Sequence, residues 1–286
     1  MTNFIIRPAS IDEFSIAVEW AANEGWNPGL SELEAFLASD PQGFLMGWLG
    51  EEPVSSISVV RYGDNFGFLW FYIVHRDHRG TGKGMATWNA GIAHLEGRTI
   101  GLDGVLDQQD NYKKSGFIFE GCGIRYTGVP TLVGTDRGDV SIRNIKQFDV
   151  DAVLDFDRNF FPSNRDIFAE KWVSPKRVTD RITKIAISDG TISGYGTIRP
   201  CRTGYKVGPL FAEDPLTAQS LFKNLCAEIP KGIEVSLDVP DANKHGLAIA
   251  QDYGLKPVFE TARMYRGQIP KLPLSKIFGI TTFELG

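Results

Sequence analysis

One short loop of the chain combines glycine with positive charge. The loop consists of Arg79, Gly80, Thr81, Gly82, Lys83 and Gly84. Glycine lets the backbone turn sharply and leaves its N–H groups open to a ligand, because no Cβ covers them. A helix that starts directly after such a loop adds further free N–H donors and the positive end of its dipole. These residue types in this order predict a binding site for a pyrophosphate.

The segments on either side of the loop are expected to hold it in place. Phe66 to Val74 is apolar and rich in aromatic residues, which predicts a largely buried strand. Met85 to Leu95 has the pattern of a helix. The predicted order is therefore strand, glycine loop, helix, which suits the binding of phosphate groups.

Two common phosphate-binding motifs do not fit this loop. A P-loop requires Gly-x-x-x-x-Gly-Lys-Ser/Thr, but Asp77 lies five residues before Gly82, and Gly84 follows Lys83. A dinucleotide-binding loop requires Gly-x-Gly-x-x-Gly, and its third glycine position falls on Met85. Both types of nucleotide site are therefore excluded.

The pattern Arg/Gln-x-x-Gly-x-Gly/Ala does fit, on Arg79, Gly82 and Gly84. In this pattern the loop resembles the acyl-coenzyme A loop of the GCN5-related N-acetyltransferase (GNAT) superfamily. A second motif supports the resemblance, because Tyr112 to Phe117 is similar to the superfamily's Tyr-x-x-x-Gly-Phe ending. It follows a predicted strand at Thr99 to Val105, at the distance that the superfamily has.

The resemblance implies roles for particular residues. Backbone N–H groups from Gly80 to Gly84 would hold the pyrophosphate of acetyl-CoA or another acyl-CoA. Backbone groups of Ile73 and Val74 would pair with its pantetheine arm. Tyr112 would protonate the thiolate as it leaves. The chain would thus be an acyl-CoA dependent N-acyltransferase that moves an acetyl group to the amine of a small molecule, by direct attack in a ternary complex.

Composition limits the alternatives. The chain has 286 residues, 42% of them hydrophobic and 23% charged, with a net charge of -5. These values indicate an ordinary folded protein, and the acidic balance argues against a nucleic-acid partner. No apolar stretch is long enough for a membrane span and no leader pattern is present, so a cytoplasmic protein without a membrane partner is expected. Scattered cysteines and isolated histidines predict neither a disulfide nor a metal site.

The sequence contains two copies of one pattern. Phe4 to Arg7 leads into a predicted helix at Ser10 to Trp26, and Val140 to Arg143 likewise leads into a helical pattern at Gln147 to Phe156. The ends of the copies are also alike, since Gly116-Phe117 is followed by Arg125 as Gly254-Leu255 is followed by Arg263. We therefore predict two domains, residues 1–130 and 139–286, with a linker near Val129 to Gly138.

The predicted fold class is α+β. The resemblance implies two tandem GNAT-like domains, each a mixed, mostly antiparallel twisted sheet flanked by helices. In the first copy, capping boxes are predicted at Ser10 with Glu13 and at Ser31 with Glu34. The second copy resembles the C-terminal domain of two-domain acetyltransferases of the YitH type.

The second copy has lost the predicted chemistry. Gly208 to Asp214 occupies the place of the acyl-CoA loop without its Arg-x-x-Gly-x-Gly pattern. Aligning Gly254 with Gly116 puts Ala250 in the position of Tyr112. We therefore expect the first domain to hold the cofactor, and the second to brace it and form a wall of the acceptor pocket.

One catalytic group is missing from the prediction. Many members of the superfamily take the amine proton with a glutamate on the fourth strand, but Phe66 to Val74 contains no carboxylate. Asp64 and His75 flank this strand and are interpreted as a turn residue and a loop residue, so no base is predicted. Trp20, Trp26, Trp70 and Trp88 suggest an aromatic pocket or part of the core.

Two other functions stay open at this point. The chain could be a non-catalytic sensor that binds coenzyme A, which the missing carboxylate favours, or an acyltransferase whose acceptor is a hydroxyl or a thiol. The acceptor, the acyl chain length and the oligomeric state, including a homodimer, are not determined by the sequence.

Overall fold

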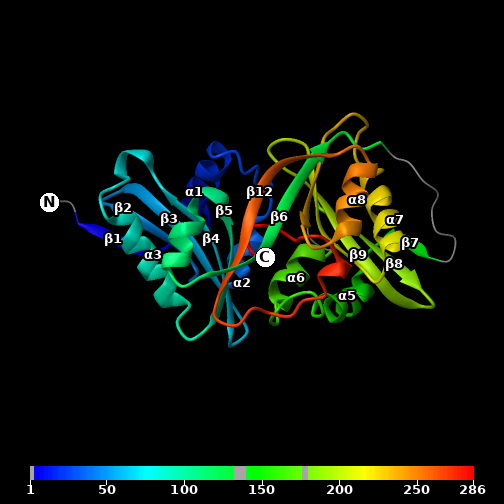
Figure 1. The fold of residues 1–286 in the computed structure, drawn as a ribbon, viewed down its shortest axis with the longest axis horizontal. Helices are drawn as coiled ribbons and strands as arrows, with labels where there is room; N and C mark the ends of the chain where they lie inside the picture. Colours follow the sequence, from blue (N-terminus) through cyan, green and yellow to red (C-terminus); the bar gives the residue numbers. More distant parts are fainter. Residues whose placement is uncertain (1–2, 132–139, 176–179) are drawn as a thin grey trace.

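The computed structural model describes residues 3–131, 140–175 and 180–286. Residues 132–138 of the predicted linker lie outside the described residues. In Figure 1 an N-terminal half and a C-terminal half lie side by side, each built of strands with helices packed against them. The molecule has the predicted α+β architecture of two GNAT-like domains in tandem.

The strands of the described residues form one continuous sheet. In spatial order the main path is β1-β2-β3-β4-β5-β12-β6-β11-β10-β9-β8-β7, and β13 pairs with β10. Neighbours are mostly antiparallel, while β4 with β5 and β10 with β11 are parallel. The strand bounds are β1 (Phe4–Pro8), β2 (Phe44–Leu49), β3 (Glu52–Tyr62), β4 (Phe66–Val74), β5 (Thr99–Val105), β6 (Ile118–Gly128), β7 (Ser141–Asn144), β8 (Ile182–Ser188), β9 (Thr191–Pro200), β10 (Tyr205–Ala212), β11 (Val235–Pro240), β12 (Lys256–Arg266) and β13 (Ile277–Gly279).

The helices cover both faces of this sheet. They are α1 (Ile11–Asn23), α2 (Leu33–Ser39), α3 (Lys83–His94), α4 (Gln109–Lys114), α5 (Val150–Asp157), α6 (Asp166–Val173), α7 (Pro215–Cys226) and α8 (Lys244–Asp252). Single 3-10 turns are η1 (Arg76–His78), η2 (Leu106–Gln108), η3 (Gln147–Asp149) and η4 (Leu274–Lys276). Among the described residues, none of these helices combines the length and the apolar character that crossing a membrane requires.

The two predicted capping boxes have different outcomes. At α1 the box is confirmed, because the side chain of Ser10 accepts from the N–H of Glu13 and the carboxylate of Glu13 accepts from the N–H of Ser10. At α2 the prediction is wrong, since Glu32 precedes the helix and makes no side-chain cap. Instead Glu32 accepts from the N–H of Gly29 at 2.9 Å and forms an ion pair with Arg199, which draws its carboxylate toward the C-terminal half.

The last strand of each half joins the sheet of the other half. β12, from the C-terminal half, pairs with β5, and β6, from the N-terminal half, pairs with β11. β6 and β12 also pair with each other, so they cross the centre of the molecule together (Figure 1). The two halves are thus joined by exchanged strands, a feature that the sequence repeat did not predict.

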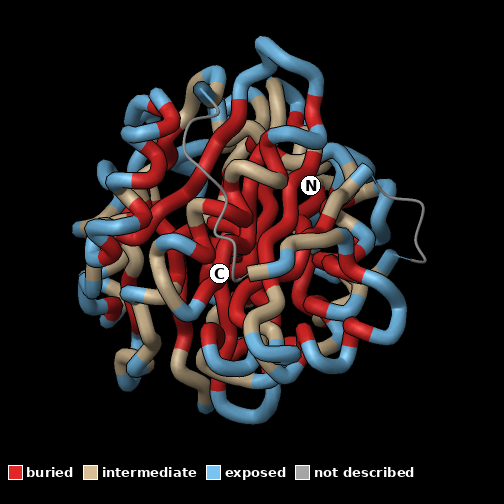
Figure 2. The backbone as a smooth tube through the Cα atoms, turned by 90° about the vertical axis from the view of Figure 1, so that its right-hand side faces the viewer, coloured by how far each residue is buried: buried red, intermediate tan, exposed pale blue. Residues whose placement is uncertain are grey.

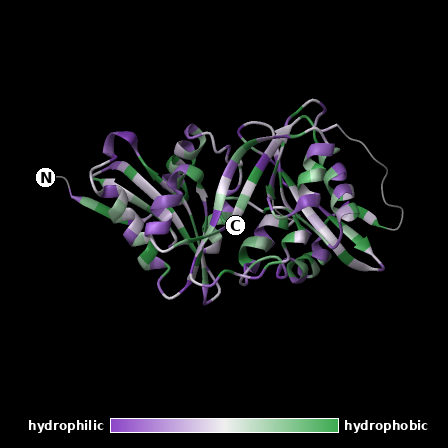
Figure 3. Ribbon diagram, viewed as in Figure 1, coloured by the Kyte–Doolittle hydropathy of each residue, from purple (hydrophilic) through white to green (hydrophobic). Residues whose placement is uncertain are grey.

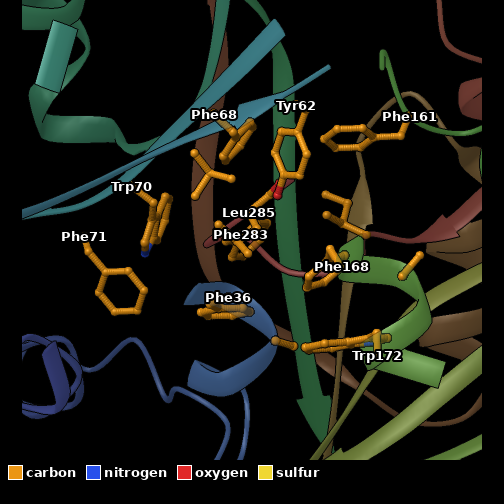
Figure 4. Packing of buried hydrophobic residues seen from close by; sticks show 14 of the residues in the cluster. Phe36, Tyr62, Phe68, Trp70, Phe71, Phe161, Phe168, Trp172, Phe283 and Leu285 are labelled. Atoms are coloured by element: carbon orange, nitrogen blue, oxygen red, sulfur yellow. The ribbon is translucent and has the colours of Figure 1, made fainter. Parts of the chain in front are cut away.

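The core crosses between the halves on one face of the sheet. Phe36 of α2 stacks on Trp172 of α6 with ring centroids 6.2 Å apart, and Figure 4 shows both beside Phe168 and Phe283. Figure 2 shows buried backbone running through the interior, and Figure 3 shows helices with both hydrophobic and hydrophilic stretches, as expected where one side packs on a sheet. Because this core is shared, the position of one half is coupled to that of the other.

Candidate active site

A cleft opens where β4 and β5 separate. The two strands pair in parallel from Phe66 to Leu69 and from Thr99 to Leu102, and then diverge. A cavity of about 320 Å³ fills the gap. It is lined by residues of β4, β5, η2, α4, the glycine loop and the loop after α1, namely Glu24, Trp26, Leu69, Trp70, Phe71, Tyr72, Ile73, Val74, Arg79, Leu102, Asp103, Gly104, Val105, Gln108 and Tyr112. Of the predicted site residues, Ile73, Val74, Arg79 and Tyr112 therefore meet in one cavity.

A β-bulge in β4 shapes the wall of this cleft. Ser56 and Ser58 of β3 lie opposite Ile73 and Trp70, so β4 contains one extra residue between them. Phe71, inside the bulge, has a φ of 46°, a left-handed conformation that is uncommon for an aromatic residue. The hydroxyl of Ser56 donates to the Phe71 carbonyl at 2.8 Å and supports this geometry. Bulges of this kind often reorient backbone groups beside active sites.

The predicted glycine loop leads directly into α3. Gly80 and Gly82 have φ values of 74° and 81°, and no described atom lies within 4 Å of the position that a Cβ would take at either residue. Gly82 is the N-cap of α3, and no side chain of the described residues caps this end of the helix. The first N–H groups of α3 consequently have no acceptor in the part of the chain that the structure describes, which is the arrangement that an external anion would use.

The two cations of the loop behave differently. The Nζ of Lys83 donates to the hydroxyl of Thr81 at 3.2 Å and stays beside the helix start. The Arg79 guanidinium instead turns to the cleft, where it donates to the Val74 carbonyl at 3.0 Å and pairs with Glu24 at 3.0 Å. Lys83 therefore offers its charge to the loop, whereas Arg79 ties the loop to β4 and to the end of α1.

Tyr112 lies against the cleft on the α3 side of the sheet. Its ring stacks on Trp88 at a centroid distance of 5.8 Å, and the absence of a side chain at Gly104 makes room for it, since a Cβ there would lie 2.2 Å from the ring. Burial, with a smaller contribution from Tyr72, raises the pKa of Tyr112 to about 12. The hydroxyl is therefore protonated at neutral pH and able to donate a proton.

Sequence reasoning missed two carboxylates that line the cleft. Glu24 follows α1 and is exposed, whereas Asp103 on β5 is only 1% exposed. Asp103 accepts two hydrogen bonds from Arg263 of the exchanged strand β12, at 2.7 and 2.6 Å. Burial raises the pKa of Asp103 and outweighs the opposing effect of Arg263. A charged residue inside the apolar run Thr99 to Val105 was the available signal.

The predicted tryptophans are divided between two environments. Trp26 and Trp70 line the cleft with ring centroids 5.2 Å apart, while Trp88 packs on the other face beside Tyr112. Trp20 lies near His75, at a centroid distance of 5.9 Å. Two of the four predicted tryptophans, Trp26 and Trp70, thus line the cleft on the face of the sheet opposite Trp88.

The corresponding region of the C-terminal half is closed. The N-terminal end of α7 is capped by its own Asp214, whose carboxylate accepts from the N–H groups of Leu216 and Thr217 at 2.9 and 3.0 Å. Between β10 and β11 lies β13, which pairs with β10 in antiparallel fashion. The N–H of Ile280, just after β13, donates to the Asp238 carbonyl of β11 at 2.7 Å. The chain's own backbone therefore fills this gap.

Ala250 takes the structural position of Tyr112. The N–H of Phe117 donates to the Tyr112 carbonyl at 3.1 Å, and the N–H of Leu255 donates in the same way to the Ala250 carbonyl at 2.9 Å. The alignment of Gly254 with Gly116 is thus reproduced in the backbone. The alanine side chain cannot act as an acid at this point of the C-terminal half.

Comparisons with known proteins agree with this architecture. Residues 11–117 match the model of the acetyltransferase (GNAT) family, and residues 153–279 match that of an acetyltransferase (GNAT) domain. Over 284 residues the chain is 34% identical to holothin acyltransferase of Pseudoalteromonas sp. (strain SANK 73390), covering 98% of this chain and 94% of that relative.

Solved structures show the same fold. A Pyrococcus horikoshii protein, provisionally described as an acetyltransferase, superposes with a TM-score of 0.81 at 20% identity, covering 100% of this chain and 97% of that one. A tandem GNAT protein from the clavulanic acid biosynthesis pathway gives a TM-score of 0.65 at 13% identity, covering 92% and 98%. With an open cleft in one half and a closed one in the other, this chain belongs to the GNAT family of acyltransferases as a tandem member.

Proposed function

We propose that the chain transfers an acetyl group from acetyl-CoA to the amine of a small molecule, in a ternary complex formed in the N-terminal cleft. The observation that carries the proposal is the start of α3, which no described side chain caps, beside a cleft that Tyr112 borders. An acyl-CoA needs both features, because its pyrophosphate requires N–H donors and its thioester requires an enclosed groove.

The cofactor would lie along β4. Backbone N–H groups from Gly80 to Gly84 and the charge of Lys83 would hold the pyrophosphate. The pantetheine arm would run past Ile73 and Val74, where β4 still pairs with β3 but β5 has diverged from its other edge. The Arg79 guanidinium, which now donates to the Val74 carbonyl, would exchange this contact for one with the cofactor or keep the loop in place.

The chemistry needs one proton donor. The amine nitrogen attacks the thioester carbonyl, a C–N bond forms, and the C–S bond breaks as the electron pair goes to sulfur. Tyr112 would give its proton to the thiolate, and its high pKa keeps that proton available at neutral pH. The attacking nitrogen releases a proton to water as the amide forms, and the tyrosinate would recover a proton through the same water, so that no net proton is gained or lost.

No residue is assigned as the base. Asp103 is occupied by Arg263, and Glu24 by Arg79. We expect the acceptor to enter as the free amine or to lose its proton to water, so kcat/KM should rise with pH until the pKa of the acceptor amine is passed. If kcat/KM instead reaches a plateau below that pKa, at a pH that is the same for every acceptor, a base from the protein is required.

Product analysis tests the proposal. The purified chain is incubated with acetyl-CoA or hexanoyl-CoA and a panel of alkyl and aryl amines, with matched alcohols and thiols. We expect free coenzyme A and the N-acetylated product to appear together. Binding of acetyl-CoA without transfer to any acceptor would favour a sensor, and transfer only to alcohols or thiols would move the acceptor atom from nitrogen. The hexanoyl arm is included because the name of the relative specifies acyl rather than acetyl transfer.

A further inference from the structure

A second cavity lies where the C-terminal half meets β6 and the start of β4, on the face of the sheet where the shared core is found. Its volume is about 270 Å³. Buried aromatic rings form one wall, among them Phe160, Phe161 and Phe211. The opposite side is covered by the segment from Pro270 to Leu274, which leads to β13. We refer to this space as the C-terminal cavity.

The C-terminal cavity lies on the same face of the sheet as Trp26 and Trp70 of the N-terminal cleft. Phe211 and Pro240, at the ends of β10 and β11, line it as Ile73 and Val105 line the cleft between β4 and β5. β13 fills the space between β10 and β11 that a cofactor would need, but it leaves the cavity beside it open. The C-terminal half has thus lost room for an acyl-CoA and kept room for a second molecule.

Two carboxylates at the C-terminal cavity are available to a ligand. Glu120 of β6 and Asp241 after β11 both line it, and within the described residues neither carboxylate has a hydrogen bond or an ion pair. Glu120 is exposed, and its partial burial raises its pKa more than the nearby Arg263 lowers it, while Asp241 and Asp103 add to the increase. A cation placed between these side chains would therefore be stabilised.

The positive groups around the cavity are mostly engaged elsewhere. Arg165 is held by Asp157, because its Nε and one terminal nitrogen each donate to that carboxylate at 2.7 Å. Arg263 is held by Asp103 in the same bidentate way. Lys271 is exposed and is the remaining cation of the lining among the described residues. The unpaired charge of the cavity is therefore mainly negative.

We propose that the C-terminal cavity binds a small organic cation, a primary amine with an aromatic or branched apolar body. Its ammonium group would contact Glu120 and Asp241, and its body would pack on the rings of Phe160, Phe161 and Phe211. No acyl transfer occurs there, because β13 fills the gap between β10 and β11 in which a cofactor would lie, and Ala250 stands in the position of Tyr112. The inference concerns binding alone and does not rest on the reaction proposed for the N-terminal cleft.

Calorimetric titration tests the charge requirement. The probe is phenethylamine, compared with its anionic analogue 3-phenylpropionate and the neutral 2-phenylethanol. We expect phenethylamine to bind, Glu120→Gln and Asp241→Asn each to weaken it about tenfold, and Glu96→Gln, at an exposed carboxylate of the N-terminal half, to leave it unchanged. The proposal would be overturned if the three probes bind equally or if phenethylamine does not bind. It would also be overturned if a variant with both substitutions, Glu120→Gln and Asp241→Asn, binds phenethylamine as well as the native chain does.

Photolabelling tests the location. 4-Azidophenethylamine is activated on the full chain and the labelled peptides are identified by mass spectrometry. We expect label within 160–165 or 270–274, and its loss in Leu272→Trp, which fills the cavity from its rim. Label only beside Trp26 and Trp70 would place the amine in the N-terminal cleft and contradict the proposal. Titration of each variant with acetyl-CoA shows separately whether the fold and the N-terminal site are intact.

Discussion

The same junction between a strand and a helix is built in two ways in this molecule. In the N-terminal half, α3 starts after Gly82, and none of the described side chains binds its first N–H groups. In the C-terminal half, α7 starts after Asp214, whose carboxylate accepts two of these N–H groups, and Pro215 removes another. A helix start can therefore either serve an external anion or be satisfied by an internal one.

The gaps between the parallel strands next to these helices also differ, one being open and the other filled. The gap between β4 and β5 is a cavity, whereas that between β10 and β11 holds β13. Gly279 lets β13 fit closely, because a Cβ there would lie 2.7 Å from the side chain of Leu237 and 3.1 Å from that of Leu210. In the C-terminal half, parts of the chain itself thus occupy the places that the proposed acyl-CoA would take, so we expect one acyl-CoA to bind per chain.

The largest effect is expected when the N-terminal junction is made like the C-terminal one. Gly82→Asp places a carboxylate at the start of α3, where it would satisfy the free donors and repel a pyrophosphate. Like charges in contact cost several kcal/mol, so we expect acetyl-CoA affinity to fall by about a thousandfold or more. Calorimetric titration measures this change.

Gly97→Asp is the matched control for this variant. Gly97 has a φ of 79° and, like Gly82, no described atom within 4 Å of its Cβ position, so the backbone strain is similar. It lies in the turn after α3, away from the loop. A comparable loss of affinity in Gly97→Asp would mean that strain, and not the anion site, accounts for the effect.

Two equivalent ion pairs hold the exchanged strands, and their surroundings differ. Arg263 with Asp103 and Arg125 with Asp238 are equivalent, since each joins an exchanged strand to the sheet of the other half. Burial acts to raise the pKa of Asp238, but Arg125 and two other cations nearby outweigh burial and hold this pKa below its usual range. Among the described residues Asp103 has Arg263 alone as a nearby cation, and burial raises its pKa.

Removal of each arginine should reveal this difference. Loss of one partner of a buried pair costs about 3–5 kcal/mol. We expect Arg263→Met to lower the free energy of unfolding by about 4 kcal/mol at pH 7, and Arg125→Met by about 3, because Lys206 and Arg199 remain near Asp238. Urea denaturation followed by circular dichroism provides both values. The reverse order would show that the neighbouring lysine and arginine give Asp238 no support.

The sequence predicted the bounds of strands better than it predicted which strands pair with each other. β4 and β5 have the predicted bounds, because long apolar and β-branched runs can be buried in few other ways. The exchange of β6 and β12 was not predicted, since both strands have the same pattern and pairing within each half would satisfy it equally. β13 spans only Ile277–Gly279, too short a run to signal a strand.

The candidate site was predicted to a similar extent. The loop and Tyr112 could be found because glycine spacing and local motifs are visible along the chain. Asp103 was missed because its partner, Arg263, lies 160 positions away and reaches it only through the exchanged strand. A charge inside an apolar strand marks Asp103 as unusual, but its contact with Arg263 depends on how the halves are assembled and leaves no local pattern.

Tyr112→Phe tests the acid that the second half lacks. Proton donation by a positioned side chain contributes on the order of a hundredfold or more to turnover. We expect kcat to fall about a hundredfold while the affinity for acetyl-CoA, measured by titration, stays the same. Tyr126→Phe, a buried tyrosine of β6 in the C-terminal core, is the control and should keep full activity. Equal turnover of Tyr112→Phe and the native chain would remove Tyr112 from the mechanism.

The smallest effect concerns the pH dependence of the two aspartates. Asp103 has a raised pKa when folded, so the folded state takes up its proton before the unfolded state does as the pH falls. Its contribution to stability therefore becomes more favourable from the folded pKa down to the unfolded pKa of about 3.9, by about 1.4 kcal/mol for each pH unit between these two values. Asp238 has a lowered pKa, so its contribution is constant down to about 3.9 and is lost only below that value.

Asparagine variants isolate these two contributions, because asparagine does not titrate. As the pH falls from 7 toward 4.5, we expect the stability cost of Asp103→Asn to grow, because the pKa of Asp103 is raised in the folded state, and the cost of Asp238→Asn to stay constant. Urea denaturation of the native chain and both variants at a series of pH values measures this. If both costs are constant over this range, Asp103 stays ionised as Asp238 does. The two halves would then differ in the gap beside the helix start, but not in the charge of the aspartates that pair with the exchanged strands.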